Sequence, residues 1–304
     1  MGKDKLLVII VTYNAMHWAE RCFSCILNSI IKPDVLVVDN GSTDGTQAYI
    51  KDLLPESVLI QSDINLGFGK ANNIGLQFAL DNNYDYVYLL NQDAWFFPDT
   101  IGKLISISKK YPEYGILSPF QMNSDMMHID RNFVANVLKW ESNPDICSDM
   151  YNQVYEDVYP VSEVMAAHWF MTINCIRKVG GFSPTFTHYA EDGNYIDRVH
   201  YWGFKVGVVP SLKVVHDRGG RNDSVEKVLY LTFANTKKGL SAPNNNTFRL
   251  YIISIFDSFL HMIRYKSISP INYQLKITSS MGAIISNKKI SMNSNCAFLR
   301  IVDK

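Results

Sequence analysis

Three groups of polar side chains stand directly after short apolar runs of the sequence: Thr12-Tyr13-Asn14, Asp39-Asn40-Gly41-Ser42 and Asn91-Gln92-Asp93. A carboxylate such as Asp39 can accept a hydrogen bond from a ring N–H of a nucleobase, and the ring of Tyr13 can cover a base. Asp93 suits a divalent cation, because Mg²⁺ takes few protein carboxylates and keeps phosphate oxygens and water among its ligands. These residue types therefore predict a site for a nucleotide diphosphate and its cation.

The stretch Asn91-Gln92-Asp93 has a second interpretation. It ends the apolar run 86–90, and the same side chains also suit a turn or the cap of a helix after Pro98. In an open α/β sheet, ligands bind just beyond the carboxyl ends of the strands. On these residues alone, the binding site and the turn are equally open.

The glycine-rich stretch 65–75 opens a predicted helix but matches neither of two familiar nucleotide motifs. Gly67-Phe68-Gly69-Lys70 lacks the spacing of a P-loop, and the stretch lacks the third glycine of the dinucleotide fingerprint. The amino end of the helix can still face an anion. A plain turn followed by a cap is the alternative.

The three polar groups that follow apolar runs can meet only if the runs form one sheet. The pattern in the first half of the chain predicts such a sheet. Strict alternation of strands and helices predicts an α/β fold, in which a mostly parallel, Rossmann-like sheet carries helices on both faces. Apolar runs predict strands at 6–11, 35–38, 58–61, 86–90 and 115–118, and helical spacing predicts helices at 17–30, 46–54 and 98–110. One more helix opens from the glycine-rich stretch and runs to about residue 80.

Later segments are less regular. Periodicity weakens over 121–159, where a long insertion is typical of a binding loop or lid. Further apolar patterns stand at 161–176, 205–209 and 214–216, with a helix expected at 194–202. Past residue 220, helices are expected at 225–240 and 248–263.

Composition excludes several classes of protein. Of 304 residues, 47% are hydrophobic and 19% are charged, so the chain can bury a sizeable core. Its 29 Lys and Arg balance its 29 Asp and Glu, which argues against nucleic acid as a partner. The five cysteines imply no disulfide framework. Cys22 and Cys25 form a C-x-x-C, for which packing in a helix and redox or metal chemistry are the two interpretations.

No apolar run reaches the roughly 18 residues that a membrane span needs, and Met1-Gly2-Lys3 leads into a strand without a signal-peptide core. We therefore expect a cytoplasmic protein. The aromatic helix at 248–263, with Arg249, Arg264 and Lys266 at its ends, has two interpretations. It packs in a core or dimer, or it lies in the membrane interface. In the second case residues 248–266 make peripheral contact with the inner face of the cell membrane.

The motifs together resemble those of family 2 glycosyltransferases with the GT-A fold, in the subgroup of rhamnosyltransferase-like enzymes of bacterial cell-surface polysaccharide synthesis. The resemblance covers about residues 5–220, where the motifs fall in the family's order and spacing. It rests on segments 11–14, 37–46, 65–69 with Asn72 and Gly75, 89–93, 180–182, and Glu191-Asp192 followed by Asp197-Arg198, Gly203 and His216.

The resemblance implies an inverting, metal-dependent hexosyltransferase. Such an enzyme moves a sugar from a nucleotide-diphospho-sugar to a hydroxyl of a saccharide or lipid-linked saccharide acceptor. It also implies a GT-A catalytic domain over 1–222, with a nucleotide-binding half (1–118) and an acceptor half (119–222). A helical C-terminal extension would follow over 223–304.

Roles for single residues follow from the same resemblance. Asp93 matches the last residue of the family's DXD motif, which binds Mg²⁺ or Mn²⁺, and His216 matches a position that can complete the metal shell. Asp192 would be the general base, with Glu191 beside it, and the two carboxylates can raise one another's pKa. The donor nucleotide would be held by Thr12, Tyr13, Asn14, Asp39, Asn40, Gly67, Asn72, Asn91 and Gln92.

Two departures from the family pattern leave alternatives open. The first DXD position is Asn91, which would bind ribose or a metal-bound water instead of the metal itself. His168 and Trp169 stand where smaller residues are usual, and both are candidates for the acceptor site. Trp169 either stacks on an acceptor sugar or packs in the core. For His216, a structural histidine is the alternative to a metal ligand.

Two other functions compete with sugar transfer. One is a nucleotidyltransferase or sugar-nucleotide hydrolase on the same fold. The other is a catalytically idle sugar-nucleotide-binding protein, which Asn91 and the neutral charge permit. The donor sugar and base, the acceptor, the linkage and the oligomeric state are not specified by these motifs.

Overall fold

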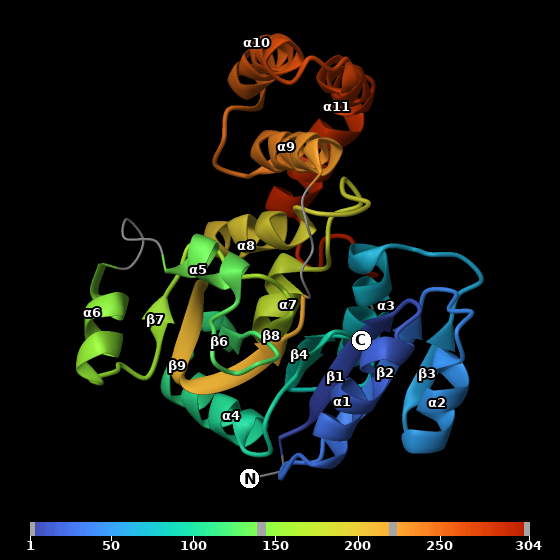
Figure 1. Cartoon of the computed structure of the whole chain (residues 1–304), viewed down its shortest axis with the longest axis vertical. Coiled ribbons are helices and arrows are strands. Elements are labelled where there is room, and N and C mark those ends of the chain that lie inside the picture. Colours follow the sequence, from blue (N-terminus) through green and yellow to red (C-terminus); the bar gives the residue numbers. More distant parts are fainter. Residues whose placement is uncertain (1–3, 139–143, 219–223, 301–304) are drawn as a thin grey trace.

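Within the residues that the computed structural model describes (4–138, 144–218 and 224–300), the strands form one nine-stranded sheet (Figure 1). Its order is β3-β2-β1-β4-β8-β6-β9-β5, and β7 pairs with β9. The strands are β1 Leu6–Thr12, β2 Asp34–Asp39, β3 Val58–Gln61, β4 Tyr86–Asn91, β5 Ala94–Trp95, β6 Tyr114–Met122, β7 Tyr159–Pro160, β8 His168–Thr172 and β9 Lys205–His216.

The first four strands are parallel, as the alternation of strands and helices predicts. In their register Thr12 of β1 lies opposite Asp39 of β2, and Val11 lies opposite Asn91 of β4. The polar groups that follow these strands therefore meet at one edge of the sheet.

Two regions of the sheet differ from the sequence-based expectation. The apolar stretch 161–176 contains strand β8, which is antiparallel to both β4 and β6, and then the start of helix α7. The strands expected at 205–209 and 214–216 are one strand, β9. Its pairing with β6 shifts after Val209, next to Pro210. Proline has no N–H to donate to the ladder, so a bulge rather than a strand end suits this position.

Helices cover both faces of the sheet. Leu7 and Ile9 pack with the helices α3, α7 and α8, whereas Val8 and Ile10 pack with α1, α2 and α4. This alternation follows from the two-residue period of side chains along a strand. The helices are α1 Met16–Leu27, α2 Thr46–Leu53, α3 Phe68–Asp81, α4 Thr100–Lys110, α7 Ile173–Val179 and α8 Glu191–Tyr201.

The insertion at 121–159 is not simply a loop. It contains the short helices α5 (Arg131–Val137) and α6 (Pro144–Asn152). Helix α5 begins at Asp130, whose side chain accepts a hydrogen bond of 2.8 Å from Phe133 N. Phe133 and Val137 are buried in the main core, so this helix is fixed to the sheet.

Three helices make up the C-terminal extension: α9 Val225–Ser241, α10 Thr247–Tyr265 and α11 Ser269–Asn293. Leu240, Ile277 and Ile284 form a small core among them. The expected domain boundary between residues 222 and 223 lies outside the described residues.

The segment after α11 returns to the end of helix α7. Gly181 N donates a hydrogen bond of 2.8 Å to Ala297 O, and Cys296 N donates one of 2.9 Å to Arg177 O. A Cβ at Gly180, where φ is +88°, would overlap the Ala297 backbone. The Gly-Gly pair of the sequence motif therefore makes room for this returning segment.

Cys22 and Cys25 are buried on α1 and are free thiols. Burial raises the pKa of Cys25 to about 12 and raises that of Cys22 as well. Protonated, enclosed thiols fit the packing interpretation of this C-x-x-C.

Candidate functional site

The carboxylate of Asp39 organises the edge of the sheet where β1 and β2 end. Thr12 Oγ1 donates to Asp39 Oδ1 at 2.7 Å, and Gln47 Nε2 donates to Oδ2 at 2.7 Å. The backbone N–H of Ser42 also donates to Oδ2, at 2.9 Å. Burial by itself would raise the pKa of Asp39, but the hydrogen bonds from Ser42, Gln47 and Thr12 hold the pKa below its usual value.

Asp39 and Thr12 expose no surface in this structure. A base can reach the Asp39 carboxylate only where the Gln47 amide, which now occupies Oδ2, moves aside. In this structure Asp39 orders the loop after β2 through these hydrogen bonds. Direct contact of Asp39 and Thr12 with a base remains a proposal.

Tyr13 and Gln92 join the ends of β1 and β4. Tyr13 N donates to Gln92 Oε1 at 2.7 Å, and Gln92 Nε2 donates to Tyr13 O at 3.2 Å. The Tyr13 side chain is 47% exposed, so its ring is available to a ligand. Asn14 has a φ of +49°, and its side chain accepts from Thr43 N at 2.9 Å.

The glycine-rich loop packs against the segment that leads into α8. At Gly67, φ is +78°, and an added Cβ would lie 2.5 Å from Thr187 O. Asn40 Oδ1 accepts from Leu66 N at 3.4 Å and ties the loop to the end of β2. Asn72, by contrast, is buried and donates to Phe68 O within its own helix at 3.0 Å. Asn72 is thus held within its own helix in this structure, and its contact with the donor stays a prediction.

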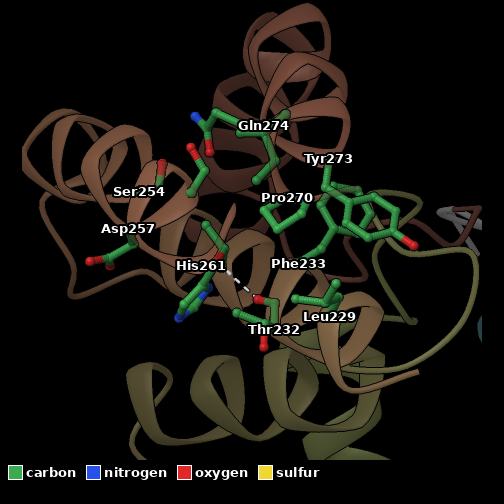
Figure 2. A pocket seen from close by; sticks show the side chains of 12 residues that line it. Leu229, Thr232, Phe233, Ser254, Asp257, His261, Pro270, Tyr273 and Gln274 are labelled. Atoms are coloured by element: carbon green, nitrogen blue, oxygen red, sulfur yellow. Dashed lines mark hydrogen bonds between the residues drawn. The ribbon is translucent and has the colours of Figure 1, made fainter. Parts of the chain in front are cut away.

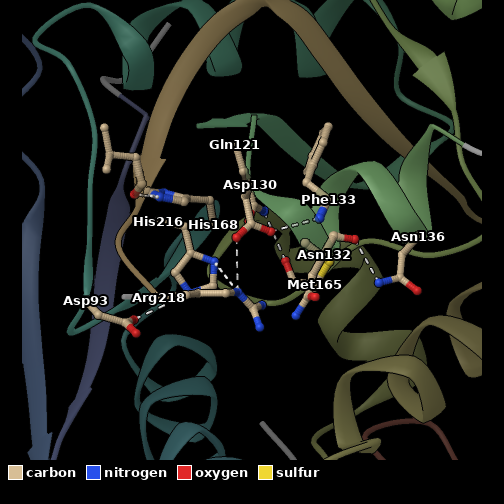
Figure 3. Close-up of polar contacts among 11 residues, drawn as sticks. Asp93, Gln121, Asp130, Asn132, Phe133, Asn136, Met165, His168, His216 and Arg218 are labelled. Carbon is tan, nitrogen blue, oxygen red and sulfur yellow. Dashed lines mark hydrogen bonds and ion pairs between the residues drawn. The ribbon is translucent and has the colours of Figure 1, made fainter. Parts of the chain in front are cut away.

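Asp93 and His216 come together where β5 pairs with β9. His216 Nε2 lies 3.5 Å from Asp93 Oδ1, and both side chains are largely buried (Figure 3). Two ligands at right angles on one ion would be about 3 Å apart at the bond lengths of Mg²⁺. The separation and the carboxylate–imidazole donor set therefore fit one divalent cation.

Within residues 4–138, 144–218 and 224–300, no cluster of three or more His, Cys, Asp or Glu side chains could hold a metal. The two side chains at this position would need oxygens from elsewhere to complete the shell of a cation. A diphosphate and water supply such oxygens, as Mg²⁺ sites commonly use them.

Arg218 and Asp130 were not foreseen from the sequence. Arg218 Nε lies 3.3 Å from His216 Nδ1 and 3.4 Å from Asp130 Oδ2 (Figure 3). Asp130 is buried and also caps α5, so the insertion at 121–159 holds the arginine in place. Neither residue belongs to a recognisable sequence motif, and only their spatial contacts identify them.

The structure places His168 in the core instead of the acceptor path. Its Nδ1 lies 2.8 Å from the Tyr88 hydroxyl, and its Nε2 lies 2.8 Å from Val215 O. Burial lowers the pKa of His168 to about 3, so the imidazole is neutral. Both ring nitrogens are occupied inside the protein, so in this structure His168 has no free nitrogen to offer an acceptor.

Trp169 also lies in the core. It is fully buried, stacks on Phe182 with ring centroids 6.1 Å apart, and donates through Nε1 to Val164 O at 3.3 Å. The packing alternative holds for this residue. An enclosed indole cannot stack on an acceptor sugar, so that expectation is wrong.

The pair Glu191-Asp192 begins helix α8 after a strained turn. Tyr189 and Ala190 have backbone φ values of +65° and +67°, which residues other than glycine rarely adopt. Such strain persists only where the surrounding structure imposes it, and it clusters at functional sites. The turn directs the two carboxylates to different places: Glu191 is buried, whereas Asp192 keeps partial exposure.

The environments of the two carboxylates differ in charge as well as in exposure. Burial, together with the charge of Asp192, raises the pKa of Glu191 to about 8. Among the described residues its Oε2 has no hydrogen-bond partner. Burial also raises the pKa of Asp192, but the Gly193 N–H and the charges of Lys238 and Arg218 act against that rise. A neutral Glu191 would leave Asp192 as the carboxylate of the pair that can exchange a proton, and unequal environments of this kind separate acid from base roles.

Lys238 reaches this pair from α9 in the C-terminal extension. It forms an ion pair with Glu163. Its Nζ would lie 3.0 Å from a Cβ added at Gly193, so the ammonium passes beside the first turn of α8. Helix α9 thus belongs to the candidate site, although the sequence resemblance ends before it.

Replacing Glu191 with Gln is expected to remove a pH-dependent penalty on stability. The pKa of Glu191 is higher in the folded chain (about 8) than its ordinary value of 4.5. The folded state therefore holds the proton where the unfolded state has lost it, and stability falls as pH rises through this window. Between about pH 5 and pH 8, unfolding free energy from denaturant titration should fall about 2–5 kcal/mol more in the wild type than in Glu191→Gln. Equal pH slopes in the two proteins would contradict the assignment.

Comparison with known proteins gives a family match over the first half of the chain. Residues 7–154 match the model of the family described as "Glycosyl transferase family 2". This segment contains Asp39 and Asp93 and ends before Glu191.

Among curated proteins, the chain resembles N-acetylglucosaminyl-diphospho-decaprenol L-rhamnosyltransferase from Mycobacterium tuberculosis. The two are 28% identical over 235 residues, which cover 71% of this chain and 76% of the relative. The match is therefore longer than the family segment.

Two solved structures share the fold. Residues 1–349 of S. aureus TarS in complex with UDP-GlcNAc align with a TM-score of 0.58 at 13% identity, covering 95% of this chain and 83% of that one. The chain spans 43% of a longer TarS structure. The mannosyltransferase PcManGT from Pyrobaculum calidifontis, in complex with GDP-Man and Mn²⁺, aligns with a TM-score of 0.57 at 17% identity, covering 94% and 76%. The expected GT-A fold is confirmed.

Proposed function

Since residues 7–154 belong to glycosyl transferase family 2, we propose that this chain is an inverting, metal-dependent hexosyltransferase. Its donor is a nucleotide-diphospho-sugar, and its acceptor is a hydroxyl of a glycan or a lipid-linked saccharide used for a cell-surface polysaccharide. The observation that carries the proposal is the convergence of the ends of β1, β2 and β4 at one sheet edge. The acceptor class is supported by the lipid-linked substrate in the name of the mycobacterial relative.

The donor lies, in this proposal, across the edge formed by β1, β2 and β4. The exposed Tyr13 ring covers the base, and Asp39 receives its ring N–H after Gln47 moves aside. Asn91 and Gln92 line the path from the base towards Asp93. Asp93 and His216 hold the divalent cation, Mg²⁺ or Mn²⁺. When bound, that cation neutralises negative charge on the leaving diphosphate.

Asp192 acts as the base in this proposal. Inverting transfer needs one group, opposite the leaving diphosphate, to take the proton of the acceptor hydroxyl. Asp192 is the more exposed residue of the pair. Burial raises its pKa, which suits a base, and the charges of Lys238 and Arg218 limit that rise. Glu191 stays neutral at physiological pH, so it adds no second negative charge beside the base.

A panel of nucleotide-sugars, each measured by thermal shift with and without Mn²⁺, tests the donor. A donor at 100 times its Kd should stabilise the fold by about 2.7 kcal/mol. Product analysis with saccharide acceptors then separates the candidate functions. Transfer with release of a nucleoside diphosphate supports the proposal. Pyrophosphate release, donor consumption without acceptor, or binding without turnover would point to the nucleotidyltransferase, the hydrolase or the idle binding protein, respectively.

Replacing Lys238 with Met is expected to shift the acid limb of the kcat/KM profile to higher pH by roughly one unit. The loss of a nearby positive charge disfavours the ionised form of Asp192, so the base needs a higher pH to lose its proton. Glu191, Glu163 and Arg218 are the other charged or titratable groups that face this carboxylate. The measurement is the pH dependence of transfer under donor-limiting conditions.

Lys237 provides a matched control for this variant. It is also partly buried on α9, but it donates to Thr185 O and its charge is not among those that act on Asp192. Lys237→Met should leave the acid limb in place, and Lys238→Arg should restore it. If Lys238→Met is fully folded and its pH profile of kcat/KM is not shifted, Lys238 has only a structural role.

A further inference from the structure

Helix α10 turns its large apolar side chains away from the protein. Its outer face consists of residues at helical spacing: Phe248, Ile252, Phe256, Phe259, Leu260 and Ile263. Phe248 is 74% exposed, Phe256 66% and Ile263 70%. Exposed apolar residues are common singly, but a continuous row along one helix marks an interaction surface.

The centre of the inner face of the same helix is polar, and Leu250 and Tyr251 beside it pack against the small core of the C-terminal helices. Ser254 and Ser258 are buried and donate to carbonyls of their own helix, those of Tyr251 and Ile255. Figure 2 shows Ser254 and His261 beside a cavity of about 60 Å³ that residues of α9 and α11 also line. An ordinary surface helix has the opposite pattern, with its apolar stripe towards the core. Packing on α9 and α11 therefore accounts for the inner face, which includes Leu250 and Tyr251, and it leaves the outer row exposed.

Basic residues stand at both ends of the outer face. Arg249 lies in the first turn of α10, and Arg264 and Lys266 lie at its end. The acidic residue of this helix, Asp257, stands at the edge of the outer face and lines the cavity instead. Long basic side chains beside an apolar face suit lipid headgroups, because their stems lie along apolar surface while their charges reach anionic phosphates.

The position of α10 leaves its outer face accessible. Figure 1 shows the helix at the end of the molecule, on the far side of α9 from the sheet. Among the described residues, no helix has the length and apolarity to cross a bilayer. A helix with this pattern suits a position along the surface of a bilayer.

We propose that the outer face of α10 binds the surface of an anionic bilayer, with the helix parallel to the membrane plane. A second copy of the chain suits the face less well. If two α10 helices packed antiparallel, Arg249 of one copy would meet Arg264 and Lys266 of the other. If they packed parallel, Arg249 would lie beside Arg249 of the other copy, and Arg264 and Lys266 would lie beside the same residues of that copy. The inference stands on the packing of α10 and does not depend on the proposed sugar transfer.

Co-sedimentation of the full chain with vesicles tests the proposal. Vesicles of phosphatidylcholine with phosphatidylglycerol should bind the protein more tightly than vesicles of phosphatidylcholine alone. The triple variant Phe256→Ser, Leu260→Ser and Ile263→Ser should bind the mixed vesicles on the order of 100-fold more weakly, because three large apolar groups no longer enter the interface. These side chains are 66%, 62% and 70% exposed, so thermal unfolding should stay unchanged.

A matched control carries Ile30→Ser, Met127→Ser and Val154→Ser. These residues are exposed to a similar extent (70%, 81% and 69%) but lie outside the C-terminal helices. The control should bind vesicles as the wild type does. Arg249→Gln with Arg264→Gln should weaken binding to the mixed vesicles selectively.

Three outcomes would overturn the proposal. The first is a wild type that does not sediment with mixed vesicles, and the second is an equal loss in the control variant. The third is a wild-type dimer, seen by light scattering, that the triple variant converts to monomer without a change in vesicle binding. Transfer to a water-soluble acceptor should be equal in the wild type and the triple variant, so a failure of the proposed enzymatic function would be seen separately.

Discussion

Asp192→Asn is expected to lower kcat for sugar transfer by about 10²–10⁴-fold, the usual contribution of a general base. The amide keeps the size of the side chain but cannot take a proton from the acceptor hydroxyl. Asp192 already accepts a hydrogen bond of 2.8 Å from Gly193 N through Oδ1, and an amide oxygen can accept the same bond. The backbone turn should therefore survive, and donor affinity should stay within a factor of a few. Single-turnover transfer, donor titration and thermal unfolding measure the three effects.

Glu191→Gln is the matched comparison for this result. Glu191 is buried, its pKa is raised to about 8, and it is already neutral at physiological pH. Replacing a protonated carboxyl with an amide changes little charge, so transfer should fall much less than in Asp192→Asn. If Glu191→Gln lost as much activity, or if Asp192→Asn kept full activity, the base would have to be assigned to another group.

The meeting of the polar ends of β1, β2 and β4 at one sheet edge could be predicted from the sequence because it depends on short segments. Each apolar run ends in polar residues within a few positions, and parallel strands carry their carboxyl ends to the same edge. The pairing of Thr12 with Asp39 and of Val11 with Asn91 confirms that reasoning. Local pattern was sufficient there because neighbouring strands have the same direction and a register fixed by their buried faces.

The acceptor side could not be read in the same way. His168 and Trp169 lie on β8, whose side chains enter hydrophobic clusters on both faces of the sheet. The contributions of Arg218, Asp130 and Lys238 come from residues far apart in the sequence. Only the folded chain brings Lys238 of α9 beside Gly193 of α8.

Asp93→Asn is expected to lower metal-activated kcat by about 10²–10³-fold, the cost of removing one group that stabilises charge in the transition state. Asp93 is the carboxylate that faces His216, at 3.5 Å from its Nε2. An amide oxygen is a weaker ligand for a hard cation than a carboxylate. The Mn²⁺ concentration needed for half-maximal activity should therefore rise, whereas donor binding measured without metal should change little. Metal titrations of transfer and of donor affinity measure the two quantities.

Asp99→Asn is the matched control, because Asp99 is an exposed carboxylate that pairs with Lys103 on the helix after the site. It should leave the metal dependence unchanged. His216→Gln should have an intermediate effect, since the carboxylate of Asp93 would remain. The alternative, in which His216 is only structural, predicts a loss of stability in His216→Gln with an unaltered metal requirement. Equal metal dependence in Asp93→Asn and the wild type would remove Asp93 from the metal site. Asn91 would then have to be tested as a ligand, because it ends the same strand, β4.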